Sequence, residues 1–521
     1  MELIKATQKD VQIKSDESRF AECRVGDLME ISDGETRLIT MISQLTSSDI
    51  ETTIEEDEFL ESVKIPSVKV IDCDIIGSIT DGKFTNAFDE HVYISKATAR
   101  KITSKEFSSM LQPDKSKCFK IGTYAGYDTP AYVNGNKFYQ RHACIVGNTG
   151  SGKSETVTKF VEETAKNPGA SLIIFDIHGE YSNLSYADNI KIGENFSFPI
   201  WLLGFGDMVA NILKLKEESA TVAMSALRKA YYYCCSGGGN ESKPLCYRFG
   251  DILTLLKRMN EEMVGTGEVY KSGAKAGQEK TTKGDYNGKL TGIINTMETL
   301  YNDSRYSFLF ERKPQEYLNE AINRIMGAHK PVKNIDLSEA PHDIAIMIIG
   351  AITKLIYNVQ IKKKDATPIT LVCDEAHVYI PTDFQLSASQ RRMVEIFENI
   401  AKEGRKFGIT LFVASQRPSE LNRTIMAQCA NYIVMKLNNE NDKSMMKGVM
   451  AEGSSGIIET TTMFSPGDCL IIGDAVPIPL KIKVELAKER PQAKTIEFWD
   501  EWKKERAAVD YTECLDEYLR N

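Results

Sequence analysis

The sequence predicts an α/β fold: a parallel central sheet covered by helices, preceded by a small β-barrel and interrupted by a helical insertion. Three observations predict it. Short β-branched runs separated by turns occupy residues 1–115, apolar runs alternate with helical stretches from about residue 119, and one of these runs leads into a glycine-rich loop. A chain of 521 residues has room for roughly two to four domains.

The N-terminal region, residues 1–115, reads as short strands. Runs rich in β-branched residues lie at 67–72, 75–79 and 91–95. The dipeptides Asp33-Gly34 and Asp81-Gly82 are typical of tight turns. Several short strands at this spacing predict a small β-barrel.

Residues 116–485 read as the α/β domain. The apolar runs are long enough for buried parallel strands, and helical stretches lie between most of them. The runs that we expect to form strands are 143–146, 172–175, 369–373, 409–414, 432–435 and 469–472.

Residues 205–345 are too long for a simple crossover between two strands. They contain helical patterns at 207–235 and 247–262, and a Gly/Lys/Thr-rich stretch at 271–289. We therefore predict a helical insertion with mobile loops inside the α/β domain. Residues 486–521 read as a charged helical tail.

Composition favours a cytoplasmic protein. The start of the sequence has no apolar signal region, and the most apolar run, 344–352, is shorter than a bilayer requires and predicts a buried helix. The 11 cysteines lack paired spacing, which fits reduced thiols and no zinc site. The net charge of −9 argues against a generally basic protein that coats nucleic acid, although it leaves room for a local basic channel.

The strongest signal is GNTGSGKS, which follows the strand-like run HACIV and precedes a helical run. The motif G-x-x-x-x-G-K-[ST] predicts a loop whose glycines let the backbone N–H groups wrap around phosphates. We expect Lys153 to reach the β and γ phosphates of ATP and Ser154 to ligate Mg²⁺. The expected nucleotide-binding residues are Gly147, Asn148, Thr149, Gly150, Ser151, Gly152, Lys153, Ser154 and Glu155.

A second strand ends in two acids, in ITLVCDEAH. We expect Asp374 to hold Mg²⁺, through water, and Glu375 to orient and deprotonate the attacking water. Neighbouring residues of a strand point to opposite faces, but the chain turns here, so both acids could face the nucleotide. A helix that begins with an Asp-Glu pair is the structural alternative.

Polar residues near other strand ends complete the predicted site. Gln416, at the end of LFVASQRP, could sense the γ-phosphate, or it could be an ordinary polar strand end. Arg405, in EGRKFG, could place a cation on the γ-phosphate of a neighbouring subunit, a contribution of about 10³–10⁵ in rate, or it could lie at a solvated helix end. Arg141 is a second candidate, with a phosphate-independent salt bridge as its alternative.

The segment DIHGEY closes the strand at 172–175, and acids at such an edge lie near a nucleotide crevice. Glu180 could support the attacking water or a neighbour's arginine. His178 and His377 are weaker candidates for catalysis, because a single histidine usually has a structural role.

In their order along the chain, these motifs resemble the HerA-type ATPases, in the HerA/FtsK branch of RecA-like motors. The motifs are RHACIVGNTGSGKS, DIHGEY, VCDEAH, EGRKFG, ASQRP and SPGDCLIIGDA, and they span nearly the whole chain. VGDLMEI and IIGSI resemble pieces of the family's N-terminal barrel, the HAS barrel. Ile177 stands where proline is common in the family, a departure to which we attach no catalytic consequence.

The resemblance implies a RecA-like fold and a homohexameric ring with a channel for double-stranded DNA. It implies an arginine finger at Arg405 that acts on the next subunit, assisted by Arg141. It also implies an effector docked on the barrel face: a NurA-like or other nuclease in DNA end processing, or a nuclease or sirtuin-like NADase in anti-phage defence.

The expected function is therefore that of an ATP-driven translocase or helicase for double-stranded DNA. A conjugation or secretion pump would require a membrane anchor, and we expect no membrane partner. An ATP-regulated ring scaffold that assembles and activates an effector enzyme is the alternative from a different class. For DNA contacts, the lysine-rich stretches 362–364 and 271–289 are candidates, and solvated loops are the alternative.

Overall fold

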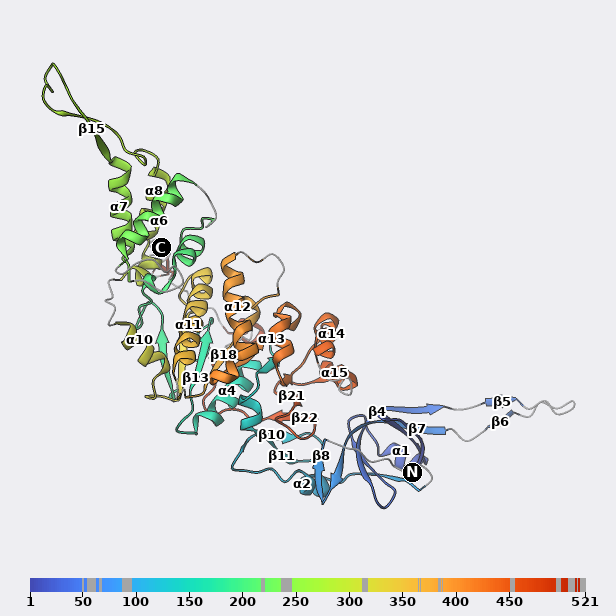
Figure 1. Ribbon diagram of the computed structural model, residues 1–521. Helices are drawn as coiled ribbons and strands as arrows, with labels where there is room; N and C mark the ends of the chain where they lie inside the picture. Colours follow the sequence, from blue (N-terminus) through green and yellow to red (C-terminus); the bar gives the residue numbers. More distant parts are fainter. Residues whose placement is uncertain are drawn as a thin grey trace. The chain divides into compact units, whose positions relative to one another are not determined.

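The computed structural model describes most of the chain, as two compact units (Figure 1). The described residues are 1–48, 51–53, 62–64, 68–86, 96–216, 221–235, 246–311, 317–363, 365, 367–382, 386, 388–449, 455–492, 498–504, 511–512 and 514–515. The first unit consists of Met1–Leu172, Thr367–Thr382 and Glu398–Arg490, and the second of Ile173–Ala366, Asp383–Phe397 and Pro491–Asn521. The domain boundaries predicted at residues 115, 205, 345 and 485 stay predictions.

The first unit begins with the predicted barrel. Six strands close on themselves in the order β2-β1-β9-β3-β4-β7, because β7 pairs back with β2. They are β1 (Glu2–Ala6), β2 (Asp10–Ser15), β3 (Leu28–Ser32), β4 (Arg37–Ser48), β7 (Val68–Thr80) and β9 (Thr98–Lys101). Alternate residues such as Val11 and Ile13 fill the interior, as the two-residue period of a strand requires. Smaller elements are α1 (Glu17–Ala21), β5 (Glu51–Thr53), β6 (Ser62–Lys64), β8 (Lys83–Thr85) and α2 (Ser104–Leu111).

The predicted turns are confirmed. Asp81 and Gly82 both have positive φ, 50° and 73°, and join β7 to β8 where Thr80 pairs with Lys83. A two-residue hairpin loop needs this left-handed backbone, which Asp and Gly tolerate. The runs predicted at 67–72 and 75–79 belong mainly to the single strand β7, whose described part begins at Val68. The run predicted at 91–95 lies outside the described residues.

The first unit continues with an eight-strand section of the central sheet, in the order β11-β10-β22-β21-β20-β12-β19-β18. The strands are β10 (Cys118–Tyr124), β11 (Thr129–Asn134), β12 (Ala143–Val146), β18 (Ile369–Cys373), β19 (Ile409–Ser415), β20 (Asn431–Val434), β21 (Asp468–Gly473) and β22 (Lys481–Val484). The four strands β18, β19, β12 and β20 run parallel, as predicted.

The prediction that the run at 469–472 forms a parallel strand is wrong in direction. It forms β21, which pairs antiparallel with β20. Because β21 is buried along nearly its whole length, its apolar pattern is the same for either direction.

Helices pack against this section of the sheet. They are α3 (Gly135–Tyr139), α4 (Lys153–Ala165), α13 (Arg423–Gln428), α14 (Glu440–Val449) and α15 (Ser455–Thr460), together with the end of α12 (Ala388–Glu403). On α4, the ring centroid of Phe160 lies 4.9 Å from that of Phe138 and 5.7 Å from that of Phe412 on β19. Burial of these aromatic rings fixes α4, and with it the glycine-rich loop at its start, against the strands.

The second unit contains the strands β13 (Leu172–Asp176), β17 (Val332–Asp336) and β14 (Ala187–Lys191), in the order β13-β17-β14, and β17 pairs parallel with β14. Its helices are α5 (Phe205–Asp207), α6 (Val222–Cys234), α7 (Phe249–Glu261), α8 (Thr291–Asn302), α9 (Ser307–Phe310), α10 (Tyr317–Met326), α11 (His342–Lys362) and α16 (Phe498–Trp502). The helical insertion is therefore confirmed. The helix predicted at 207–235 is broken, since Lys214 has a φ of 54° and α6 begins only after the Thr221 cap.

The prediction of a mobile loop at 271–289 is wrong in part. Residues 263–283 form an antiparallel hairpin of β15 (Met263–Val269) and β16 (Glu279–Lys283), and Figure 1 shows it extending beyond α7 and α8. Gly273 and Gly277 in this stretch had suggested a loop, and they lie in the connection between the two strands, whereas Glu279–Lys283 form the second strand.

The predicted buried helix at 344–352 is confirmed as part of α11. Ile344, Ile348 and Ile352 are at most 1% exposed. Within the described residues, α11 is the one helix with the length and apolar composition of a membrane span, and 56% of that stretch is buried inside the protein. A core helix of a soluble fold has the same character.

Candidate nucleotide site

The glycine-rich loop lies between β12 and α4, as predicted. Its backbone is held on both sides: Asn148 N–H donates to Lys436 O at 2.9 Å, and Gly467 N–H donates to Ser151 O at 2.8 Å. Gly150 and Gly152 have φ values of 77° and 92°, a left-handed backbone that only glycine adopts without strain. The loop therefore turns sharply into the first turn of α4, where the helical N–H groups have no partner within the helix.

The loop has no room for side chains at its ends. A Cβ on Gly147 would lie 2.7 Å from Met435 Cβ and 2.7 Å from Ser151 Oγ, and a Cβ on Gly152 would lie 3.0 Å from the Gly467 nitrogen. Close packing thus favours glycine at both positions, and Gly152 also needs the left-handed backbone that glycine allows.

Lys153 and the two predicted acids come together at the carboxyl end of the parallel strands. Lys153 forms an ion pair with Glu375, and its Nζ lies 3.7 Å from Asp374 Oδ1. All three residues are at most 6% exposed. Glu375 has a φ of 45°, and its N–H is accepted by Asp374 Oδ1 at 3.0 Å. This left-handed turn brings both acids to the same lysine, which the alternation of a continued strand would not allow.

Gln416 joins this cluster from the end of β19. Its Nε2 donates to Glu375 Oε1 at 2.5 Å, and its Oε1 accepts from the Thr149 hydroxyl of the glycine-rich loop. Gln416 therefore connects the acid to the loop that would surround the phosphates.

The charge state of Glu375 follows from these contacts. Burial raises the pKa of its carboxyl, but the Lys153 ammonium and the Gln416 amide outweigh burial and hold that pKa below its ordinary value. Among the described residues, Oε2 of Glu375 has no hydrogen-bond donor, although His377 Nδ1 lies 3.4 Å away. Glu375 is thus an ionised carboxylate with one oxygen open to accept a proton.

His377 lies beside this cluster, which its sequence alone did not indicate. Its Nδ1 is 3.2 Å from Ser415 Oγ, and burial lowers the pKa of the imidazole. A neutral His377 supports Glu375 by packing and polarity without neutralising it.

Ser154 and Glu155 occupy the first turn of α4. Glu155 Oε1 lies 3.7 Å from Arg490 Nε, while burial raises the pKa of its carboxyl. Across the described part of the chain, no group of three or more His, Cys, Asp or Glu side chains is placed to hold a metal ion. A metal at this site would therefore depend on Ser154, Asp374, water and the nucleotide's own oxygens, which is the ligand set that Mg²⁺ prefers.

Arg405 and Arg141 lie at the opposite end of the parallel strands, where β19 and β12 begin. Arg405 is exposed and precedes β19, whose 7 residues separate it from Gln416 by about 20 Å at the usual strand rise. Arg141 precedes β12, which is parallel to β19 with Ala143 opposite Phe412. Neither arginine can reach the phosphate loop of its own chain.

His142 fixes this edge of the sheet. Leu411 N–H donates to His142 Nδ1 at 3.0 Å, so the ring proton lies on Nε2, which is 2.9 Å from Ala401 O of α12. The two hydrogen bonds connect Arg141's strand to the helix that ends just before Arg405.

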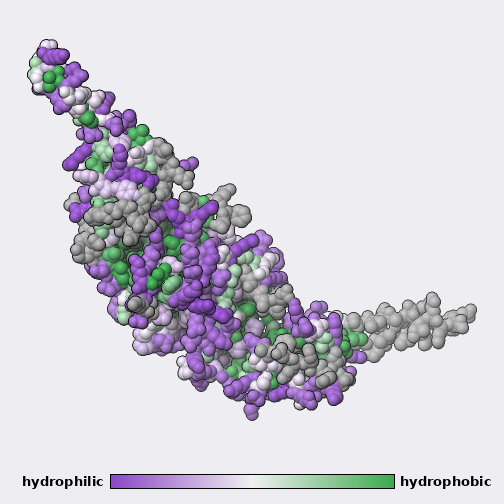
Figure 2. Space-filling model, viewed as in Figure 1, coloured by the Kyte–Doolittle hydropathy of each residue, from purple (hydrophilic) through white to green (hydrophobic). Residues whose placement is uncertain are grey.

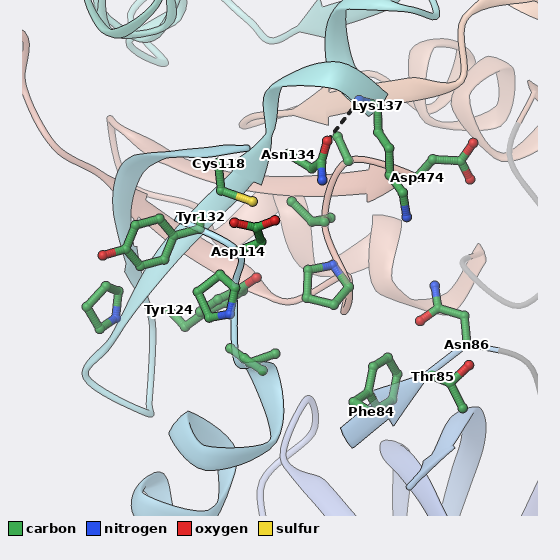
Figure 3. Close-up of a pocket in the computed structure, with 16 residues that line it drawn as sticks. Phe84, Thr85, Asn86, Asp114, Cys118, Tyr124, Tyr132, Asn134, Lys137 and Asp474 are labelled. Carbon is green, nitrogen blue, oxygen red and sulfur yellow. Dashed lines mark hydrogen bonds between the residues drawn. The ribbon is translucent and has the colours of Figure 1, made fainter. Parts of the chain in front are cut away.

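Arg141 is held by an acid that sequence reasoning missed. Its guanidinium lies 2.8 Å from Asp474, and both side chains are about half exposed. Figure 3 shows Asp474 and Lys137 at one side of a cavity of about 480 Å³, with Phe84 and Thr85 of the barrel at another. The ion pair therefore lies beside the junction of the barrel and the sheet.

The segment DIHGEY belongs to the second unit. Asp176 is buried and accepts from the N–H groups of Glu180 and Tyr181 at 3.0 and 2.9 Å, and burial raises the pKa of its carboxyl to about 6. His178 is exposed. Asp176 thus folds the loop that carries Glu180.

Sequence reasoning missed the groups that shape the loop from outside: Met435, Lys436 and Gly467. Two of them act through backbone atoms, which leave no chemical signal in the sequence. The one available signal was SPGD, residues 465–468, whose Gly467 has a φ of 80°.

Comparisons with known proteins agree with this arrangement. The family model of the HerA helicase central domain matches residues 119–356. The DNA double-strand break repair helicase HerA of Sulfurisphaera tokodaii is 26% identical over 424 residues, covering 80% of this chain and 78% of the relative. HerA of Sulfolobus acidocaldarius is 25% identical, with 81% and 79% covered. Among solved structures, the bacterial conjugative coupling protein TrwB is 12% identical with a TM-score of 0.41, covering 76% of this chain and 94% of that one.

The matching family model covers the glycine-rich loop and the insertion, and the HerA relatives cover most of the chain. Together with the closed N-terminal barrel and the cluster of Lys153 and Glu375, they show that the chain is a P-loop ATPase that is similar to the HerA helicases over most of its length.

Proposed function

We propose that this ATPase works as a homohexameric ring that moves double-stranded DNA, together with an effector protein docked on the barrel face. The names of the HerA relatives, DNA double-strand break repair helicases, support the DNA substrate. The effector is a nuclease or an NAD-consuming enzyme, in DNA end processing or in anti-phage defence. The cytoplasmic location expected from composition fits this role.

ATP with Mg²⁺ fits the residues present. The loop turns into the start of α4 through the closely packed Gly147 and Gly152, and Lys153 supplies a buried cation at its end. Ser154 and Asp374 would hold Mg²⁺, which when bound neutralises charge on the phosphate oxygens.

Lys153 and Glu375 then change partners. Lys153 leaves Glu375 for the phosphate oxygens, which removes from the carboxylate the cation that most lowers its pKa. Glu375 becomes a better base and accepts the proton of the attacking water at Oε2. Gln416 holds Glu375 Oε1 in place through one hydrogen bond and connects it to Thr149 of the loop through a second.

The observation that carries the ring is the position of Arg405. Charge that develops on the γ-phosphate needs a cation, worth about 10³–10⁵ in rate, and Arg405 is separated from its own loop by the length of β19. Arg405 therefore serves the loop of a neighbouring subunit. Arg141, held by Asp474 at the same edge, assists it.

A Glu375→Gln variant tests the base. It keeps the size and hydrogen bonds of the side chain, so ATP binding should persist while turnover falls by about 10²–10⁴. Glu420→Gln, which removes an exposed acid near the end of the neighbouring strand, should turn over normally. Persistent hydrolysis by Glu375→Gln would exclude Glu375 as the base.

Mixed rings test the shared site. Lys153→Ala and Arg405→Ala subunits should each be inactive alone and should regain part of the activity when mixed, because some junctions then combine an intact loop with an intact arginine. Lys153→Ala mixed with Glu375→Gln is the control, since both lesions fall in one cluster and cannot complement. Absence of rescue at every mixing ratio would contradict an arginine that acts between subunits.

An ATP-regulated scaffold for the effector is the second candidate, because the barrel is a separate closed sheet that can bind a partner without turnover. Removal of residues 1–115 should abolish capture of the co-expressed neighbouring gene product. Retained capture would contradict docking on the barrel under either function.

A further inference from the structure

The hairpin at residues 263–283, here called the lysine ribbon, is an exposed element of the second unit. Every residue of β15 is exposed (Figure 1), and Figure 2 shows hydrophilic surface with small hydrophobic patches over this projection. An isolated two-stranded hairpin is at best marginally stable in water, so contact with a partner would stabilise this element. We propose that the lysine ribbon binds the phosphate backbone of duplex DNA, an inference that rests on the proposed function.

The stem of the lysine ribbon is anchored firmly. Gly284 N–H and Asn287 Nδ2 donate to Glu262 O at 3.0 and 2.9 Å, and Leu290 N–H donates to Asn260 Oδ1 at 2.9 Å. These bonds tie both strands to the end of α7 and the start of α8. The base of the ribbon is therefore fixed to these helices.

The tip carries positive charge that the protein leaves unneutralised. Residues 263–283 contain four lysines and two glutamates. Glu268 is paired with Lys280 at 3.0 Å, and Glu279 accepts from Gly267 N–H at 3.0 Å. Within the described part of the chain, Lys271 and Lys275 have no acidic partner within ion-pair distance. In a protein of net charge −9, such a tip is a local attractor for phosphate.

The shape of the tip also suits a nucleic acid. Between Lys271 and Lys275 lie only Ser272, Gly273 and Ala274, so the backbone can approach a surface closely. A two-stranded ribbon is narrow enough for the major groove of B-DNA, with lysines on either side of the tip reaching the phosphates. Phosphate contacts carry no sequence information, so binding through these lysines should be independent of sequence.

A protein partner is the competing occupant, because Met263, Val264 and Val269 of the stem are 51%, 46% and 52% exposed. These side chains lie on the stem, whereas the charge lies at the tip, the part of the ribbon farthest from its anchor. The unneutralised lysines therefore favour DNA.

The test uses the full-length protein and a linear DNA duplex of mixed sequence. Lys271→Ala/Lys275→Ala should weaken DNA binding and lower DNA-stimulated turnover, while turnover without DNA stays unchanged. The slope of log affinity against log salt should fall by roughly 1 for each lysine that leaves a phosphate, so by about 2 for each chain that engages the duplex. Lys271→Glu/Lys275→Glu should weaken binding further, and Lys5→Ala/Lys14→Ala on the barrel is the control of equal charge.

The outcomes separate this inference from the proposed function. Wild-type protein that neither binds nor responds to duplex DNA would remove the proposed function and this inference together. Wild-type binding with an unchanged salt slope in the Lys271/Lys275 variants would overturn only the role of the lysine ribbon. Unchanged DNA binding with a lower assembled mass in those variants would assign the ribbon to a contact between proteins instead.

Discussion

Protonation of His142 should loosen the edge of the sheet that carries Arg141 and Arg405. The ring is 4% exposed, accepts from Leu411 N–H at Nδ1 and donates from Nε2 to Ala401 O. Burial, with a smaller contribution from the Arg405 charge, lowers the pKa of His142 to about 4 from the ordinary value of 6.5. A proton on Nδ1 would replace an acceptor with a second donor that faces Leu411 N–H.

The size of the effect follows from this difference in pKa. Because the folded state lowers the pKa, the unfolded state binds the proton first, and stability is lost as pH falls from 6.5 through 4. A difference of about 2.5 pKa units corresponds to about 3 kcal/mol in full, of which about 2 kcal/mol is lost by pH 5. Above pH 6.5 the neutral ring contributes its full share.

The assay compares wild type with His142→Gln, whose amide can accept from Leu411 N–H and donate to Ala401 O but does not titrate. Hydrogen exchange of the β12 and β19 amides, corrected for intrinsic rates, reports the free energy of local opening at each pH, which avoids treating a protein of two units as two-state. Wild type should lose about 2 kcal/mol more than His142→Gln between pH 7.5 and 5. His178→Gln, at an exposed histidine, should behave as wild type.

Equal pH slopes for wild type and His142→Gln would refute the reasoning. That result would mean that the amides of β12 and β19 open without exposing the His142 ring to water, or that water already reaches the ring in the folded state. Either case would remove His142 as the element that joins Arg141's strand to α12.

Gly147→Ala should weaken ATP binding and destabilise the first unit by about 1–3 kcal/mol, because the new Cβ would lie 2.7 Å from Met435 Cβ and Ser151 Oγ. Titration with a fluorescent nucleotide measures the affinity, and thermal melting measures the stability. A variant that binds ATP with wild-type affinity would contradict the close packing of the loop. Asp474→Asn should change the free energy of unfolding by less than about 1 kcal/mol, because its ion pair with Arg141 is half exposed. The same variant should alter ATP turnover. Unchanged turnover would mean that the ion pair does not position Arg141 for catalysis.

Much of the sheet could be predicted from sequence because buried strands are short apolar runs bounded by turns. β12 and β18 begin and end at the predicted residues, and β19 extends one residue further. The direction of β21 could not be predicted, because burial on both faces gives the same pattern for either orientation. The hairpin at 263–283 was missed because its strands face solvent and have no apolar face to mark them.

The sequence by itself determined which residues make up the nucleotide site, because a phosphate loop needs glycines at fixed spacing followed by Lys153, and because Asp374 and Glu375 end a buried strand. Only the tertiary structure decided how they meet: the left-handed backbone of Glu375 turns both acids toward Lys153, and Gln416 reaches Glu375 across 41 residues of chain and Thr149 across 267. The same holds for the opposite edge, where Asp474 holds Arg141 and His142 joins three elements. Such contacts are set by strand order and by backbone hydrogen bonds, which no local pattern of side chains encodes.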